Sequence, residues 1–275
     1  MRTALDRSEQ QDAQARVAVR APVVHEAIRL QGEEELARPA MSLAWSALAA
    51  GLSMGFSLIT EGILATYLPA AKWSPLVIRM GYSVGFVLVI IGRQQLFTEN
   101  TLTVVIPLLA RRNSFTFMRV LKVWGVVLAG NLVGAHIIAL AISSMGVFPA
   151  PVQAHFLELS REAAAVTFWS GVFKGIFAGW LIALMVWMLA AVEQGKLTIV
   201  LIMTYVVALG SFTHIIAGSV ELLYLVWTGD KSWLAYFTGY LAPALLGNSI
   251  GGVALVSALN HAQVVAGVST LRASG

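Results

Sequence analysis

His214 is the side chain in this sequence best suited to chemistry at membrane depth, because it breaks an otherwise apolar segment. It lies in a polar interruption between Gly210 and Gly218, directly after Thr213. A histidine can present an N–H, carry a transient positive charge or transfer a proton near neutral pH. An ionisable residue inside a membrane segment is by default a functional candidate. The hydroxyl of Thr213 could bond the same solute, or it could cap the loop.

A second polar interruption lies between Gly92 and Asn100, in the other half of the chain. It contains Leu96, Phe97 and Thr98, again between apolar runs. Irregular backbone at membrane depth is tolerated only where protein buries it or where it lines a water-filled cavity. Two such breaks, one in each half, predict a solute site near the middle of the membrane in a transporter or channel.

The composition places the chain in a membrane. Of its 275 residues, 58% are hydrophobic and 12% are charged, whereas soluble proteins have about 25% charged residues. Several apolar runs reach about 20 residues, the length that spans a bilayer. There is no cysteine, which excludes disulfides and thiolate ligands. The net charge is +4, but the basic residues are divided among loops, so nucleic acid is not expected as a partner.

Six membrane-spanning segments are expected, which makes the protein an all-α integral membrane protein. They cover about residues 41–67, 74–110, 117–143, 164–190, 197–227 and 234–258, and the second and fifth are broken by the two interruptions. Residues 41–262 then form the pore domain, between an N-terminal tail of residues 1–40 and a short C-terminal tail of residues 263–275. Apolar residues from Val23 to Leu30 fall roughly at helical spacing. The N-terminal tail therefore holds either an amphipathic helix on the membrane surface or a solvated helix.

The Lys and Arg residues predict the orientation in the membrane. With the N-terminus in the cytosol, most of those outside the spans fall on the cytosolic side, and only Lys72, Arg161 and Lys231 fall on the other. Positively charged loops tend to remain on the cytosolic side. Both termini are therefore expected in the cytosol.

The two halves of the chain share three motifs in the same order. Each half opens with glycines four residues apart, continues with a Phe-Thr pair in its break, and ends with a Gly-Asn motif. The glycines are Gly51 and Gly55 in one half and Gly175 and Gly179 in the other, and the Gly-Asn motifs begin at Gly130 and Gly247. Three spans per half is an odd number, so the second half enters the membrane from the opposite side and the repeat is inverted.

An inverted repeat brings the two breaks together at the midplane. Each break is followed by a second half-helix, expected to start at Thr101 in one half and at Ser219 in the other. Helix N-termini carry partial positive charge and attract anions. Two N-termini that converge on one apolar-walled pore predict a site for a small monovalent anion.

The residues around the breaks resemble those of the formate/nitrite transporters. The motif Gln95-Leu96-Phe97-Thr98 matches the first break of that family, His214 matches the central histidine of its second break, and the run Gly247–Gly252 matches its last span. The resemblance covers about residues 41–262 and is strongest with a divergent branch, the YfdC-like inner-membrane proteins. It implies an aquaporin-like fold with a 3+3 inverted repeat. It also implies a homopentamer with one pore per protomer in a bacterial-type inner (plasma) membrane.

The resemblance implies roles for particular residues as well. The candidate pore and substrate residues are His214, Thr98, Thr213, Phe97, Leu96, Tyr82, Phe86 and Val207, of which Phe97, Tyr82 and Phe86 align with the apolar constrictions of the family. Transporting members carry an acidic residue directly before the central histidine and an asparagine four residues after it. This chain has Thr213 and Gly218 at those positions. Lys174, within the fourth span, either snorkels or places a positive charge in the pore.

Other polar residues near the breaks are expected to be structural. Asn131 and Asn248 are expected to tie the backbone of the breaks to neighbouring helices. Arg93, Glu99 and Glu221 are the charged residues near the breaks. Because buried charges need partners, an ion pair between the arginine beside one break and the glutamate beside the other is expected to join the two repeats.

The sequence thus predicts a channel or transporter for small monovalent anions or their neutral weak acids. A pore for neutral small solutes and a non-conducting membrane scaffold or sensor remain alternatives on the same fold. No enzyme, metal site or cofactor is expected. Catalysis or metal binding needs clustered ligands, whereas the carboxylates Glu61, Glu99 and Glu221 are scattered along the sequence.

Overall fold

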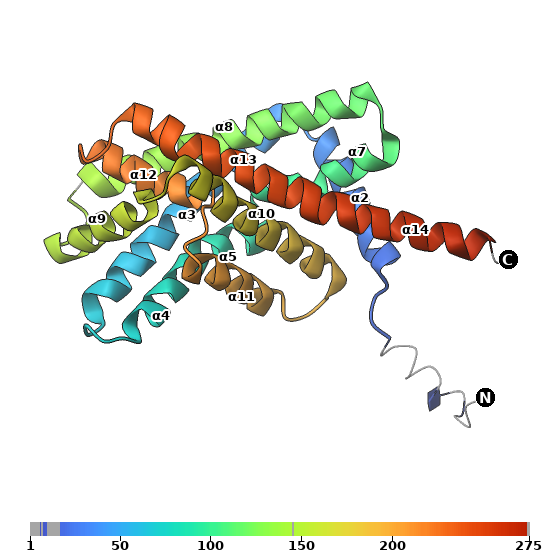
Figure 1. Ribbon diagram of the computed structural model, residues 1–275, viewed down its shortest axis with the longest axis horizontal. Helices are drawn as coiled ribbons and strands as arrows, with labels where there is room; N and C mark the ends of the chain where they lie inside the picture. The colour runs from blue at the N-terminus through green and yellow to red at the C-terminus, as the bar shows by residue number, and fades with distance from the viewer. Residues whose placement is uncertain (1–5, 7, 10–16, 145, 274–275) are drawn as a thin grey trace.

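The structure, a computed structural model, describes residues 6, 8–9, 17–144 and 146–273, with side chains described as far as Gly267. Every element in this part of the chain is a helix (Figure 1). Among these residues, five helical segments are long and apolar enough to cross a membrane: α3 (Ala40–Tyr67), Ser74–Ile91, α8 (Ser114–Ser144), α10 (Phe168–Ala191) and Ala235–Gly267. Two shorter apolar helices, α11 (Lys196–Leu209) and α12 (Ala217–Trp227), lie where the fifth span is expected.

Two of these segments are composite. Ser74–Ile91 joins α4 (Ser74–Ile78), the 3-10 helix η1 (Arg79–Tyr82) and α5 (Ser83–Ile91). The last segment joins the π-helix η2 (Ala235–Leu241), α13 (Ala242–Ile250), the π-helix η3 (Gly251–Ala258) and α14 (Leu259–Ala273). π-Helical turns are rare and frequently lie at functional sites. The helix continues through α14 beyond residue 258, where the span was expected to end.

Both expected breaks are present, and both are shorter than expected. After α5 the helix resumes with α6 (Phe97–Thr103) and α7 (Val105–Arg111), and after α11 it resumes with α12. The expected second half-helices began a few residues too late, so Thr98 belongs to the first turn of α6. The residue after the first glycine of each break, Arg93 or Ser211, has a left-handed backbone with φ of 55° or 45°. This conformation is strained for residues other than glycine.

Asn131 of α8 holds the first break in place. Its Oδ1 accepts the N–H of Phe97 at 2.9 Å, and its Nδ2 donates to the carbonyls of Ala47 and Gln95, both at 2.8 Å. Ala47 lies on α3, so one fully buried side chain joins three parts of the fold. Buried backbone groups need hydrogen-bond partners, and the irregular backbone of the break finds them in Asn131.

Asn248 of α13 holds the second break with the same set of bonds. Its Oδ1 accepts the N–H of Ile215 at 2.9 Å. Its Nδ2 donates to the carbonyls of Gly175 on α10 and Thr213 in the break, at 2.9 and 2.8 Å. This asparagine too is fully buried.

These bonds define the register of the repeat, and the register differs from the expected one. Phe97 corresponds to Ile215, and not to the phenylalanine of the other Phe-Thr pair, because each donates its N–H to the asparagine of its own half. In the first helix of each half, a Cβ added to Gly51 or to Gly179 would overlap the carbonyl oxygen of that asparagine. Gly51 therefore corresponds to Gly179 rather than to Gly175.

Part of the N-terminal region forms a helix, α2 (Ala21–Ala37), that packs against the membrane domain. Val24 and Ile28 are buried with Leu102 of α6 and Ile106 of α7. A Cβ added to Gly32 would overlap a backbone carbonyl of α6. The expected helix is thus present, and Val24 and Ile28 pack on protein, whereas Val23 and Leu30 are exposed.

The connector between the third and fourth spans also contains a helix, α9 (Ala150–Ala164), that the sequence analysis missed. Its Phe156 is fully buried and packs edge-on against Tyr224 of α12, with ring centroids 5.9 Å apart. Figure 1 shows α9 and α4 at one end of the long axis, and α2, α14 and both termini at the other. These ends are called the α9 end and the α2 end below.

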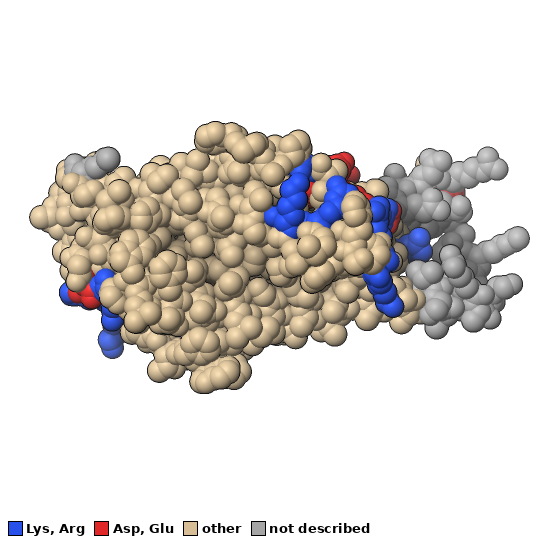
Figure 2. Space-filling model, turned by 90° about the horizontal axis from the view of Figure 1, so that it is seen from above, with Lys and Arg blue, Asp and Glu red and all other residues tan. Residues whose placement is uncertain are grey.

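Charged residues gather at the two ends of the molecule. On the face shown in Figure 2, Lys and Arg form a larger group at the α2 end and a smaller group at the α9 end, with a broad band free of charged residues between them. Such a band matches the apolar core of a bilayer. The chain is therefore a multi-pass membrane protein.

Candidate transport site

His214 and Thr98 meet where the two breaks converge. His214 Nε2 and Thr98 Oγ1 lie 2.9 Å apart, and both side chains are fully buried. Thr98 belongs to the first turn of α6, and His214 lies shortly before α12, so the contact lies at the N-terminal ends of both half-helices. The partial positive charges of two helix N-termini make this place favourable for an anion.

The backbone of the second break selects the tautomer of His214. Its Nδ1 accepts the N–H groups of Ile216 and Ala217, at 3.3 and 3.2 Å, so a hydrogen on Nδ1 would break both bonds. The neutral ring therefore carries its hydrogen on Nε2, which donates to Thr98 Oγ1. The Thr98 hydroxyl accepts this bond and keeps its own hydrogen to donate. A solute between the two side chains would meet one N–H and one O–H.

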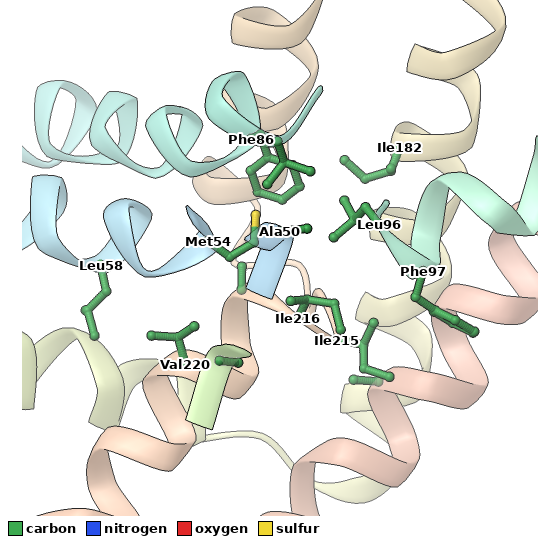
Figure 3. Close-up of a cluster of buried hydrophobic side chains, with 14 of the residues drawn as sticks. Ala50, Met54, Leu58, Phe86, Leu96, Phe97, Ile182, Ile215, Ile216 and Val220 are labelled. Atoms are coloured by element: carbon green, nitrogen blue, oxygen red, sulfur yellow. The ribbon is translucent and has the colours of Figure 1, made fainter. Parts of the chain in front are cut away.

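Apolar side chains enclose this contact. The ring of Phe86 lies edge-on to His214 with centroids 4.9 Å apart, and Tyr82 packs against Phe86 at 5.3 Å. Figure 3 shows Phe86, Leu96 and Ile182, which come from three different elements, grouped beside the break. All three are fully buried. A full charge is costly in such surroundings, so a weak acid crosses them more easily in its neutral form.

A cavity of about 40 Å³ lies on the α9 side of this contact. Thr213, Val207 and Tyr82 form part of its wall, together with four charged residues, Arg79, Lys174, Glu162 and Glu221. Lys174 is one of the residues of this wall, and a role for its charge in the pore stays a prediction. Tyr82 lies in the wall of the cavity and packs against Phe86, whose ring in turn packs against His214.

Arg79 is the centre of an ionic network at this mouth. It bonds Glu61 Oε1 at 3.0 Å and Glu162 at 2.5 Å, and it lines the cavity together with Glu221. The Glu61 side chain is 0% exposed, a burial that an unpaired carboxylate would not sustain. Glu61 and Glu221 are far apart in the sequence, but in the fold Glu61 bonds Arg79 and Glu221 lines the same cavity as Arg79.

A larger cavity, of about 420 Å³, lies under α2 at the opposite end. Arg93 and Glu99 line it, together with Glu34 and Glu35 of α2. The expected ion pair between Arg93 and Glu221 is therefore wrong, because these residues line cavities at opposite ends of the site. Glu221 instead lines the cavity at the α9 end together with Arg79 of the first repeat.

Two of the expected solute contacts have other partners in the structure. The Thr213 hydroxyl donates to the carbonyl of Gly171 at 2.6 Å, although the residue also lines the cavity at the α9 end. The ring of Phe97 packs edge-on against Trp124 of α8 at 5.6 Å, and Figure 3 shows it pointing away from Phe86. A role for either residue in binding solute stays a prediction.

Sequence reasoning missed Tyr240, a buried residue of the π-helix η2. Its hydroxyl donates to the carbonyl of His214 at 3.3 Å, and it lines the cavity at the α9 end. The only signal in the sequence was the glycine at position 218, because a Cβ there would overlap the Tyr240 hydroxyl. Only the three-dimensional structure shows that positions 218 and 240 are in contact.

Two broken membrane spans that meet at one buried polar contact define a helical transporter or channel of the aquaporin-like kind. Comparison with known proteins agrees. The family model described as formate/nitrite transporter matches residues 22–262. The inner membrane protein YfdC of Escherichia coli K12 is 42% identical over 249 residues, which cover 90% of this chain and 80% of the relative. The chain belongs to the formate/nitrite transporter family.

Solved structures show the same fold. An FNT family ion channel superposes with a TM-score of 0.70 and 24% identity, over 86% of this chain and 94% of that chain. A pentameric formate channel with formate bound gives a TM-score of 0.67 and 21% identity, over 79% of this chain and 94% of that one. The predicted family and fold class are confirmed.

Proposed function

We propose that this protein forms a transmembrane pore for small monovalent anions, or for the neutral weak acids that they form, with one pore in each protomer. The observation that carries the proposal is the contact between His214 Nε2 and Thr98 Oγ1 at the N-terminal ends of α6 and α12. Its one N–H and one O–H match the two oxygens of a small carboxylate or of nitrite. Formate is bound in one of the similar solved structures.

In this mechanism the anion is attracted before it is neutralised. Arg79 and Lys174 line the cavity at the α9 end, and the two helix N-termini add partial positive charge further inside. The anion then takes the place of Thr98 as acceptor of the His214 Nε2–H. Once it has gained a proton from water in the cavities, while His214 keeps its ring hydrogen, the neutral acid crosses the walls formed by Phe86 and Leu96 at a far lower cost than the anion would.

The proposal extends to assembly and orientation. We expect a homopentamer in a bacterial inner membrane, with a pore in each protomer and with both termini in the cytosol. The orientation is supported by the larger group of Lys and Arg at the α2 end in Figure 2, and the assembly by the similar pentameric formate channel. Native mass spectrometry from mild detergent should give five times the protomer mass. A monomeric mass there would count against the assembly.

Flux into proteoliposomes tests the function itself. The panel contains formate, nitrite, acetate and lactate, with glycerol and urea as neutral solutes and potassium as a cation. We expect flux of the small acids, with formate faster than lactate, and no flux of potassium. Passage of glycerol and urea without the acids would favour the neutral-solute pore, and no flux of any solute would favour the scaffold. Membership of a family of transporters argues against an enzyme.

A further inference from the structure

We propose that Tyr240 limits the size of the solutes that reach His214 from the α9 end, and so determines part of the specificity of the pore. The inference rests on the proposed function. It adds a residue from the last span to the solute site.

Two tyrosines of the π-helix η2 point toward the start of α12, the second half-helix of the fifth span. Tyr236 and Tyr240 are both buried, with 2% and 3% of their surfaces exposed. The Tyr240 hydroxyl donates to the carbonyl of His214 at 3.3 Å, and the Tyr236 hydroxyl bonds Ser219 Oγ at 3.1 Å. A π-helical turn is wider than an α-helical one and often lies at a functional site. Here it lets both rings face α12.

Gly218 provides the space that the Tyr240 side chain occupies. A Cβ at position 218 would overlap the Tyr240 hydroxyl and the ring carbon that carries it. The two residues therefore form a matched pair. The missing side chain on α12 lets the tyrosine reach the backbone of the histidine, and the tyrosine then forms the wall of the route at that level.

The cavity beside Tyr240 is small enough for one side chain to decide what fits. Its volume is about 40 Å³, and Tyr240, Tyr82, Val207 and Thr213 all belong to its wall. One water occupies a cavity of roughly 10–15 Å³, so this cavity has room for a few waters or for one small solute. Formate, with three heavy atoms, has this size. We expect acids with a longer chain to fit less well beside the Tyr240 ring.

Tyr236 offers a matched control within the same helix. It has the same ring, similar burial and a hydrogen bond to the same half-helix. It is not part of the wall of the cavity. A general effect of removing a buried tyrosine from η2 should therefore appear in both variants, whereas an effect on solute size should appear only at Tyr240.

The first test compares solutes of different length in proteoliposomes. Tyr240→Ala should raise the ratio of lactate flux to formate flux at least tenfold. Tyr240→Phe, which keeps the ring, should change the ratio less than threefold. Tyr236→Ala should leave it unchanged. All variants are first checked for an unchanged oligomer by size exclusion. An unchanged ratio in a correctly assembled Tyr240→Ala protein would overturn the proposal.

A second test does not depend on transport. Because the chain has no cysteine, Val207→Cys introduces a single thiol in the wall of the cavity. A sulfonated methanethiosulfonate reagent added at the α9 side should modify this thiol at least tenfold faster when Tyr240→Ala is also present, and no faster with Tyr236→Ala. If wild-type liposomes pass no acid but the rate rises in this way, the proposed function fails and the size limit at Tyr240 stands. Equal rates in the two backgrounds would refute the size limit.

Discussion

Asn131 and Asn248 make the same three hydrogen bonds in opposite halves of the chain. Each accepts one backbone N–H from the break of its own half and donates to one carbonyl of that break. Each also donates to one carbonyl of the first helix of its half. The site is therefore held by two copies of one structural device, which meet at the contact between His214 and Thr98.

The chemistry carried by this repeated frame is not symmetric. In the register that the asparagines define, His214 corresponds to Leu96, and Thr98 corresponds to Ile216. Each polar member of the contact thus has an apolar counterpart in the other half. The backbone frame is present twice, but it carries only one histidine and one threonine at these positions. The centre of the pore therefore has a single pair of donors.

Loss of Asn248 should destabilise the fold strongly. Asn248→Ala leaves one N–H and two carbonyls buried without partners, and each such group costs about 1–3 kcal/mol. We expect a fall of at least about 6 °C in Tm, measured by tryptophan fluorescence in detergent. Asn260→Ala, at a half-buried position on α14, serves as the control. Equal values of Tm for the two variants would mean that the asparagine does not hold the break.

The helix contact at Gly179 should tolerate no side chain. Gly179→Ala places a Cβ on the backbone of Asn248, whereas a Cβ at Gly125 of α8 has no atom within 4 Å. Because neither backbone can retreat without loss of the asparagine bonds, we expect overpacking to cost about 1–3 kcal/mol. Size exclusion should show less assembled protein for Gly179→Ala and a normal yield for Gly125→Ala. A normal yield for both would contradict the close approach of α10 and α13.

Acidification should loosen α2. His25 of α2 and His261 of α14 are joined by a hydrogen bond of 3.0 Å between Nε2 and Nδ1. Burial lowers the pKa of His25, and His261 lowers it further, while the neighbouring Glu26 raises it and Arg29 lowers it. The folded state thus favours the neutral ring. Docking of α2 should be fully stable above the ordinary pKa of histidine, about 6.5, and should weaken as the pH falls below it.

Hydrogen exchange of the α2 amides at pH 7.5 and pH 5 measures this loosening. We expect faster exchange at pH 5, after correction for the intrinsic rate, in the wild type. His25→Gln should remove most of the difference, because glutamine does not titrate. His155→Gln, at the α9 end, should leave the difference intact. All three proteins keep Arg112, a charged neighbour of His261, so its effect on the histidine pair does not distinguish them. Equal protection of α2 at both pH values would exclude a role for the histidine pair.

The sequence predicts the parts of this fold that hydrophobicity and backbone breaks encode. The first span was expected at residues 41–67 and α3 covers Ala40–Tyr67, because apolar length alone sets it. Both breaks were expected because glycine and polar residues interrupt apolar runs. The register of the repeat was misjudged, because small residues every fourth position match equally well one turn apart, and only the bonds of Asn131 and Asn248 distinguish the two alignments.

The parts that sequence could not supply are contacts between distant segments. Arg79 joins Glu61 and Glu162, three residues far apart in the chain, so no local pattern marks them as a network. Tyr240 and Gly218 are likewise matched only across two helices. The α9 helix was hidden because a short amphipathic segment with two prolines was interpreted as a connector.

The flux of formate through His214→Phe liposomes, measured from pH 5 to pH 8, tests the central claim most directly. Loss of the donor should remove an interaction that offsets roughly 2.5–3.5 kcal/mol of charge cost, which corresponds to about a hundredfold loss of flux, and the pH dependence should flatten. His214→Leu, which also lacks the donor, provides a second variant if Phe impairs assembly. Thr204→Val, at a buried threonine that bonds only its own helix α11, should behave as the wild type. Unchanged formate flux and pH dependence in assembled His214 variants would contradict the account.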